Sequence, residues 1–441
     1  MTSSQIQNNL KNPHSLHNTK TVSFINLGCS KNTVITEKIA FLFQQDGYLV
    51  IPESVDTSLF VVNTCCFLEV ARKECEDLLN SILKDYQVKE SNIIVIGCFA
   101  HMFPDIIRKS FPDIKIIQEQ DPYIGISKFL SKKTMPDKRL LSTKYYAYVR
   151  ISEGCNRKCA YCLIPAIKGP YKSYTPESIH KDCDFLKTNY AVKECIMLAQ
   201  DTSIYGEDLH NESLISLIKN ISDKNYFEWI RILYLYPTLS IERIRELLSI
   251  PNVLPYLDIP MQHLHPEILS KMRRPRQSIT FLRELVKLRS EFPNLTIRST
   301  FIVGFPGETE EHFSFLIDEL TKLKLDRVGF FAYSNEKGTE SFLLNNQVPE
   351  KVKEYRLKKA YSTQEKITES IDSTYISKKL PVLIETYDNI THTSTGRSVR
   401  EAPDVDPIIQ IHGNPFRLKN HVGNIVNCEI VSINEEYIQA N

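Results

Sequence analysis

The stretch ISEGCNRKCAYCLIP, residues 151–165, is the most informative part of this 441-residue chain. It places Cys155, Cys159 and Cys162 in a CxxxCxxC spacing directly after a predicted strand. Three thiolates on one tight loop can hold three corners of a cubane cluster and leave the remaining iron with an open position. A structural zinc site normally closes with a fourth Cys or His, but the next His, His180, lies beyond a helix-forming stretch. The loop therefore indicates an iron–sulfur centre that can bind a further ligand.

Strand-like and helix-like segments alternate around this loop. The candidate strands are AYVRIS, CIMLAQ, WIRILYL, PYLDIP, TIRSTFIVGF and RVGFFAYS, all within residues 146–375. Six strand–helix units fit an open, partial (β/α) barrel better than a closed eightfold one. The amphipathic stretch 349–375 predicts a closing helix. Residues 146–375 are therefore expected to form a partial (β/α) barrel domain.

A second set of cysteines lies in residues 21–120, where short apolar runs alternate with helical stretches as in a parallel α/β sheet. Cys29, Cys65 and Cys98 each end an apolar run, in INLGC, VVNTC and VIGC. In adjacent parallel strands the three sulfurs would emerge at one carboxyl edge, where a second cluster could form. The alternative is that they are buried small hydrophobes. Cys66 adjoins Cys65, but alternation along a strand points the two side chains apart, and we select Cys65 as the ligand.

The remaining segments have simpler interpretations. Residues 1–20 are polar and aperiodic, which predicts a disordered tail, and residues 121–145 break the α/β alternation and are expected to be a linker. Residues 376–441 contain short strands between turn residues, which predicts a small antiparallel β-barrel. The other thiols lie inside helix- or strand-like segments and are expected to be structural: Cys75, Cys183, Cys195 and Cys428.

Composition limits the class of protein. The chain has 54 basic and 53 acidic residues, so its net charge of +1 provides no global attraction to nucleic acid. No apolar run approaches the roughly 20 residues that cross a bilayer, which predicts a cytoplasmic protein without a membrane partner. In a reducing compartment the 11 cysteines are not expected to form a disulfide framework, and metal or redox chemistry becomes the leading interpretation.

The cysteine loop, with Tyr161 between its last two cysteines, resembles the signature of the radical S-adenosylmethionine superfamily. Together LGCSKN, VNTCCF, IGCFA, ISEGCNRKCAYCLIP and STFIVGFPGET resemble the methylthiotransferases, from about residue 21 to the end of the chain. This resemblance implies two [4Fe-4S] clusters and S-adenosylmethionine as cofactors. It implies that Cys29, Cys65 and Cys98 hold an auxiliary cluster that delivers sulfur, and that the last sixty residues form a TRAM domain.

Within this family several segments resemble the RimO type: CSKN, AQDTSIYG, YLDIPMQH, MRRP and GRSVREAPDVD. The RimO type methylthiolates the β-carbon of an aspartate in a small-subunit ribosomal protein. Residues 382–441 carry eight acidic and four basic side chains, a net charge of −4, which suits a basic protein partner better than RNA. The resemblance also implies an electron donor such as flavodoxin or ferredoxin, and we expect no direct nucleic-acid binding.

Contacts to S-adenosylmethionine are expected where barrel strands end, because barrel enzymes place their chemistry there. On that rule the candidates are Gln200, Asp201, Tyr236 and Gly304, in addition to Tyr161 of the loop. Each of the four could instead cap or turn its strand. His263 and His265 lie in a strand-to-helix connection, where packing or capping roles are expected, and we assign them no metal.

Two rival functions remain open at this stage. A related enzyme branch methylthiolates an adenosine in transfer RNA, and a non-catalytic iron–sulfur protein could bind clusters or transfer electrons. The second rival requires fully ligated clusters, whereas three-cysteine sites leave one iron open.

Overall fold

The computed structural model describes residues 20–130, 138–433 and 437–440, and the chain divides into two compact units, residues 1–142 and 143–441. Most of the expected tail, residues 1–19, lies outside the described residues. None of the described helices is long and apolar enough to cross a membrane.

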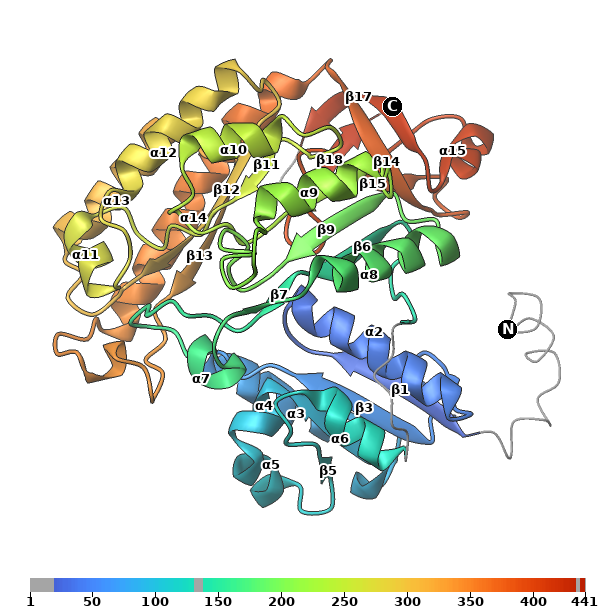
Figure 1. The fold of residues 1–441 in the computed structure, drawn as a ribbon. Helices are drawn as coiled ribbons and strands as arrows, with labels where there is room; N and C mark the ends of the chain where they lie inside the picture. The colour runs from blue at the N-terminus through green and yellow to red at the C-terminus, as the bar shows by residue number, and fades with distance from the viewer. Residues whose placement is uncertain (1–19, 131–137, 434–436, 441) are drawn as a thin grey trace. The chain divides into compact units, whose positions relative to one another are not determined.

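The first unit is a parallel sheet covered by helices (Figure 1). Its strands have the order β2-β1-β3-β4-β5, with β1 at Thr21–Asn26, β2 at Leu49–Val50, β3 at Leu59–Thr64, β4 at Ile93–Gly97 and β5 at Lys115–Ile116. The helices are α2 (Ser30–Gln45), α3 (Glu69–Asp85), α4 (Cys98–Met102), α5 (Pro104–Ser110) and α6 (Pro122–Phe129). Strands β3 and β4 are buried along their whole length, and each begins with a continuous apolar run, LFVV in β3 and IIVI in β4.

Helix α6 lies in the stretch that was expected to be a linker. Its Tyr123 and Ile126 pack with Phe43 of α2 in the core of the first unit. Asp121 caps the helix by accepting a hydrogen bond from the Tyr123 amide, and Pro122 occupies its first position. The linker prediction is wrong for residues 122–129, because Pro122 begins a short helix there and Ser127 lies within it.

The second unit contains six parallel strands, as the alternating pattern predicted (Figure 1). They are β6 (Tyr146–Arg150), β9 (Glu194–Leu198), β10 (Trp229–Ile232), β11 (Tyr256–Asp258), β12 (Thr296–Val303) and β13 (Arg327–Ala332). They pair as two three-stranded sheets, β10-β9-β6 and β11-β12-β13. A hydrogen bond from the Leu235 amide to the Asp258 carbonyl, 2.9 Å long, links the segments of β10 and β11.

Helices follow the strands of this partial barrel. They are α7 (Ile164–Lys168), α8 (Pro176–Asn189), α9 (Leu214–Asp223), α10 (Ile241–Leu248), α11 (Pro266–Lys271), α12 (Ser278–Lys287), α13 (Glu310–Leu323) and α14 (Glu350–Asp372). A short hairpin pairs β7 (Ser152–Glu153) with β8 (Lys172–Ser173). Helix α14 is the expected closing helix and lies along β13, where the Tyr361 hydroxyl donates to the Phe330 carbonyl.

The chain ends in a closed five-stranded barrel with the order β14-β15-β16-β18-β17. Its elements are β14 (Lys379–Tyr387), β15 (Ser394–Ser398), β16 (Ile408–Ile411), α15 (Pro415–His421), β17 (Ile425–Ile433) and β18 (Tyr437–Ala440). One pair, β16 with β18, is parallel, so the barrel is not wholly antiparallel as expected.

Buried ion pairs join this small barrel to the N-terminal ends of the larger barrel's strands. Arg397 pairs with Glu194 at 2.7 Å, and Arg231 pairs with the same carboxylate at 2.6 Å. Although burial alone would raise it, these two arginines hold the pKa of Glu194 below its usual value. Arg400 pairs with Asp372 at 3.0 Å, and Arg327 with Glu401 at 3.5 Å.

This network determines which charges of the acidic C-terminal segment are exposed. Arg397, Arg400 and Glu401 are buried and paired, so they contribute nothing to the exposed charge. Among the described residues from 382 on, three acidic and two basic side chains are exposed: Asp388, Asp404, Glu429, Arg417 and Lys419. Burial of two arginines and one glutamate removes a net charge of +1, so it does not make the segment less acidic, and the preference for a basic protein partner stays a prediction.

Candidate functional site

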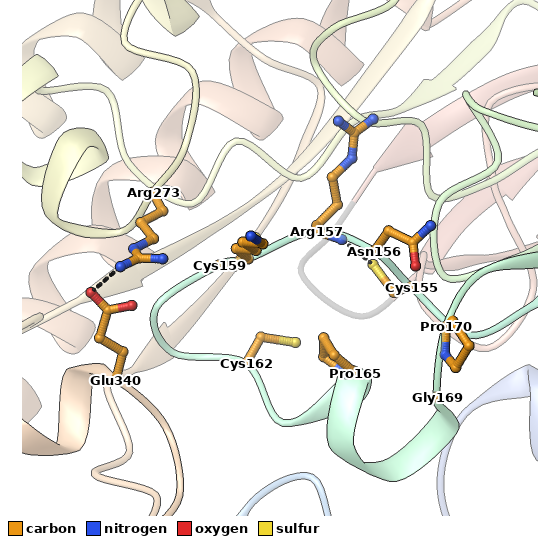
Figure 2. Close-up of a pocket in the computed structure, with 11 residues that line it drawn as sticks. Cys155, Asn156, Arg157, Cys159, Cys162, Pro165, Gly169, Pro170, Arg273 and Glu340 are labelled. Atoms are coloured by element: carbon orange, nitrogen blue, oxygen red, sulfur yellow. Dashed lines mark hydrogen bonds and ion pairs between the residues drawn. The ribbon is translucent and has the colours of Figure 1, made fainter.

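The loop after β7 carries the three cysteines of the CxxxCxxC motif. Cys155, Cys159 and Cys162 line one pocket of about 560 Å³ (Figure 2). Burial raises the pKa of the Cys155 thiol, and it raises that of Cys162 to about 12. Because the thiolate is the form that binds metals, a cation is needed to offset this cost of burial. The donor set and its burial suit a metal cluster.

Ala160 fixes the centre of this loop from two sides. Its amide donates to the Met272 carbonyl at 3.1 Å, and its carbonyl accepts from the Ser341 amide at 2.8 Å. Ala160 is also buried in an apolar cluster with Met272 and Phe305. The neighbouring Cys159 is therefore held by two segments distant in sequence.

Three of the five predicted S-adenosylmethionine contacts lie beside this loop. Tyr161 is partly buried next to Cys159, and desolvation raises its pKa well above the usual value. Asp201 accepts a hydrogen bond from Arg157 at 2.7 Å. The ring of Tyr236 lies 4.0 Å from the guanidinium of Arg157. A fourth candidate, Gln200, directly precedes Asp201.

Gly304, the fifth candidate, has a clear role in a turn. Its backbone has φ +75°, and its amide donates to the Glu308 carboxylate at 3.0 Å. A Cβ at this position would lie 2.4 Å from Cγ of Lys353. The predicted contact with S-adenosylmethionine stays a prediction, while the alternative role in turning the strand has direct support.

Buried titratable groups surround the Gly304 turn. Burial raises the pKa of Glu308 to about 7, against the opposing effect of Arg356 at 2.9 Å. His263 Nε2 lies 3.6 Å from Glu308, and burial lowers the pKa of His263 to about 3. The imidazole is therefore neutral at physiological pH.

Sequence reasoning missed Arg274, which contacts the cysteine loop directly. Its Nη1 lies 3.9 Å from Sγ of Cys159, and its guanidinium lies 4.1 Å from the ring centre of Tyr236. The side chain also donates to the Pro260 carbonyl. In the sequence Arg274 stands out only as part of the segment MRRP. Its contact with Cys159, a residue distant in the chain, is visible only in the folded structure.

Arg273, the preceding residue, lines the cysteine pocket and has an unusual backbone. The Arg273 amide donates to the Ser270 carbonyl and the Arg274 amide to the Leu269 carbonyl, which is the hydrogen-bond pattern of a Schellman helix end. Arg273 occupies the left-handed position with φ +56°, where glycine is usual and other residues cost about 1 kcal/mol. Its side chain pairs with Glu340 at 2.8 Å (Figure 2).

In the first unit the strand register brings the other three cysteines to one edge. Asn26 pairs with Asn63, and Thr64 pairs with Gly97, so Cys65 and Cys98 follow neighbouring strand positions. A Cβ built on Gly28 would lie 2.9 Å from Cβ of Cys65, which places Cys65 against the residue before Cys29. Cys66 is fully buried, whereas Cys65 is partly exposed at the edge, in agreement with the choice of Cys65.

Neutral amides support this edge. Asn32 donates to the Thr64 carbonyl at 3.2 Å, and Asn63 donates to the Asn32 carbonyl at 3.0 Å. The Thr36 hydroxyl accepts from Asn63 and donates to Asn26. Sequence reasoning missed these residues, although a buried Asn inside the apolar run VVNTC is a usable signal, since Asn is depleted in strands.

Three groups outside the cysteine sites also converge: His265, Glu267 and His312 have potential ligand atoms within 4.8 Å of one another. Nδ1 of His265 accepts the Glu267 amide and caps α11, while Nδ1 of His312 accepts the Thr309 amide. In a neutral ring that accepts at Nδ1, Nε2 carries the proton and cannot bind a metal. The expected capping role of His265 is confirmed, and we assign this cluster no metal.

The fold and the cysteine loop define the chain as a radical S-adenosylmethionine enzyme. Three family models match: the Radical SAM superfamily at residues 149–320, Uncharacterized protein family UPF0004 at residues 21–118, and the TRAM domain at residues 376–440. The chain belongs to the RimO family of methylthiotransferases, whose cofactors are S-adenosylmethionine and iron–sulfur clusters.

The relatives match over nearly the whole chain. The ribosomal protein uS12 methylthiotransferase RimO of Prochlorococcus marinus (strain AS9601) is 36% identical, over 94% of this chain and 94% of the relative. The protein of the same name from Carboxydothermus hydrogenoformans is 35% identical, over 94% of this chain and 98% of the relative. Among solved structures, the cobalamin-dependent S-adenosylmethionine radical enzyme OxsB matches with a TM-score of 0.47 and 12% identity, over 79% of this chain and 56% of that chain.

Proposed function

We propose that this chain methylthiolates the β-carbon of an aspartate in ribosomal protein uS12. The observation that carries the proposal is the presence of two separate three-cysteine sets, one on a barrel loop and one at a sheet edge. The names of the relatives support the choice of uS12 as the substrate.

Each set would hold one [4Fe-4S] cluster. On the barrel loop the ligands would be Cys155, Cys159 and Cys162, and at the sheet edge they would be Cys29, Cys65 and Cys98. Three thiolates per cluster leave one iron with an open position. When bound, the loop cluster and S-adenosylmethionine supply a 5′-deoxyadenosyl radical, and the second cluster supplies sulfur.

The chain's own residues orient the loop and limit its motion. Ala160 anchors the loop backbone, and Arg274 directs a cation toward the sulfur of Cys159. Arg157 of the loop donates to Asp201, and its guanidinium stacks on Tyr236. These two contacts fix the loop relative to the strand ends that carry Asp201 and Tyr236. We propose Tyr161, Gln200, Asp201, Tyr236 and Gly304 as the residues that contact S-adenosylmethionine from these strand ends.

Helix α2 contributes to the sheet-edge site. Cys29 is the residue that caps this 16-residue helix. The positive end of the helix dipole favours the thiolate form that a cluster needs. Asn32, in the first turn of the same helix, ties it to the carbonyl of Thr64 at the end of β3.

Anaerobically reconstituted protein should be tested with uS12 and, in parallel, with transfer RNA. We expect mass spectrometry of peptides to find a methylthio group on one aspartate of uS12 when S-adenosylmethionine and a one-electron donor such as flavodoxin or ferredoxin are present. Methylthiolated adenosine with unmodified uS12 would establish the transfer-RNA activity instead. Reduced protein that fails to cleave S-adenosylmethionine would support a non-catalytic iron–sulfur protein.

A further inference from the structure

Arg273 and Glu340 form an exposed ion pair at the pocket that the cysteine loop lines (Figure 2). Their side chains are 51% and 45% exposed. Exposed pairs of this kind contribute about 0–1 kcal/mol to stability. The pair is therefore poorly explained as a stabilising contact.

The backbone fixes both residues relative to the cysteines. Arg273 follows Met272, whose carbonyl accepts the Ala160 amide, and Glu340 precedes Ser341, whose amide donates to the Ala160 carbonyl. One residue of the cysteine loop thus anchors both ends of the ion pair. The charged groups have a defined position next to the place where the chemistry occurs.

The left-handed backbone of Arg273 decides which of two neighbouring arginines faces the pocket. A Schellman turn requires no side chain at that position, and glycine adopts it without strain. The turn sends Arg274 inward to Cys159 and leaves Arg273 at the pocket.

We propose that Arg273 binds the carboxylate of the aspartate to be modified, and that Glu340 is its partner until substrate arrives. This inference rests on the proposed function. A guanidinium binds a carboxylate through two parallel hydrogen bonds, which fixes orientation as well as charge. In aspartate the β-carbon is bonded directly to the carboxylate carbon, so holding the carboxylate also places the carbon that reacts.

The same chemistry could serve a second carboxylate, the amino-acid end of S-adenosylmethionine. The two sources differ in what a change of Arg273 would affect. If Arg273 binds substrate, its loss removes the preference for aspartate over asparagine in uS12. If it binds S-adenosylmethionine, its loss weakens the affinity for that molecule.

The experiment measures equilibrium binding to reconstituted holoenzyme without reductant. The probes are uS12, uS12 with the modified aspartate replaced by asparagine, and S-adenosylmethionine alone. We expect the wild type to prefer the aspartate form by about 10- to 100-fold, the range for a hydrogen-bonded charge. R273Q should bind both forms equally, R273K should recover part of the preference, and E340Q should bind the aspartate form more tightly than the wild type.

R276Q is the matched control, because Arg276 is an exposed arginine three residues along that instead donates to Ser270. It should behave as the wild type, and all variants should bind S-adenosylmethionine with wild-type affinity. An R273Q variant that keeps the preference for aspartate, or that loses affinity for S-adenosylmethionine instead, would overturn the inference. The proposed function would stand in that case, provided that the wild type modifies uS12. A wild type that does not modify uS12 would overturn the proposed function and this inference with it.

Discussion

The two three-cysteine sites are built by different means. The loop site takes its cysteines from one short segment, and arginines, the buried carboxylate of Asp201 and aromatic rings lie beside it. The sheet-edge site takes one cysteine from the end of each of three strands, and neutral amides support it. The first is therefore set by local sequence and charge, whereas the second is set by strand register.

Removing one ligand from each site should separate their roles and produces the largest expected effect. C159A should abolish reductive cleavage of S-adenosylmethionine, because two thiolates do not hold the cluster that supports it. C29A should retain that cleavage but lose methylthiolation of uS12. Each variant should bind about half of the wild-type iron. Product analysis by mass spectrometry and iron determination would measure both outcomes.

C183A is the control for loss of a thiol, since Cys183 is fully buried in α8 and belongs to neither set. It should keep the wild-type iron content and both activities. If C29A retained methylthiolation, the sheet edge would not be the source of sulfur, and the comparison between the two sites would fail.

A glycine precedes the first cysteine of each site, so substituting it should affect the iron content of one site and not the other. Gly28 has φ +115°, and a Cβ there would lie 2.9 Å from Cβ of Cys65. Gly154 has φ +74°, and a Cβ would lie 2.1 Å from the Pro170 carbonyl. We expect G28A to reduce iron at the sheet edge and G154A to reduce iron on the loop, each with a loss of about 1–3 kcal/mol in unfolding free energy.

G47A is the control that measures the cost of backbone strain without a steric clash. Gly47 has φ +86°, yet a Cβ there would meet no atom within 4 Å. It should cost about 1 kcal/mol of stability and leave the iron content unchanged. A G28A variant with normal iron and normal methylthiolation would show that this edge tolerates a shift of Cys65.

The two sites also differ in how well the sequence predicted them, because one is a local motif and the other depends on strand register. Cys155, Cys159 and Cys162 were identified from spacing alone, because the motif is local. Cys29 and Cys98 required the further assumption that their strands are adjacent and parallel, which the observed register supports. The six barrel strands and the closing helix were also predicted, because strongly periodic segments keep their pattern.

Contacts between distant segments could not be predicted. The position of Arg274 beside Cys159 depends on a helix end more than one hundred residues along the chain. The charge count of the C-terminal barrel did not show which charges are buried, because burial of Arg397 and Arg400 depends on partners in the larger barrel. Composition gives the number of charges but not which of them face solvent.

Arg274 offers a third way to distinguish the sites, with a smaller effect. We expect R274Q to weaken iron retention on the loop by about 10- to 100-fold, the usual effect of losing a group that supports a metal ligand. The sheet edge should keep its iron, since Arg274 is not part of it. Competition with a chelator, followed by iron determination in C29A and C29A/R274Q proteins, would measure the loop site alone. Equal retention in the two proteins would contradict a supporting role.

The unit that carries the loop contains two buried titratable groups with shifted pKa values, His263 and Glu308, whereas amides that do not titrate support the sheet edge. The pKa of His263 is about 3 in the folded chain and ordinarily 6.5, so its contribution to stability is lost as pH falls below 6.5. The pKa of Glu308 is raised from 4.5 to about 7, so its contribution is lost as pH rises from 4.5 to 7. In the wild type the two effects oppose each other between pH 4.5 and 6.5.

The variant H263N should remove the His263 contribution and leave the pH dependence that Glu308 causes. Its amide oxygen can replace Nδ1 as the acceptor of the His265 amide, but it binds no proton. Between pH 7 and pH 5 we expect H263N to gain about 2 kcal/mol of unfolding free energy relative to the wild type, because the His263 contribution no longer falls. The single tryptophan, Trp229, lies in β10, so its fluorescence reports on the unit that contains the loop. H210N, which alters an exposed histidine, should follow the wild type, and a parallel pH profile for H263N would mean that His263 is not held neutral in the fold.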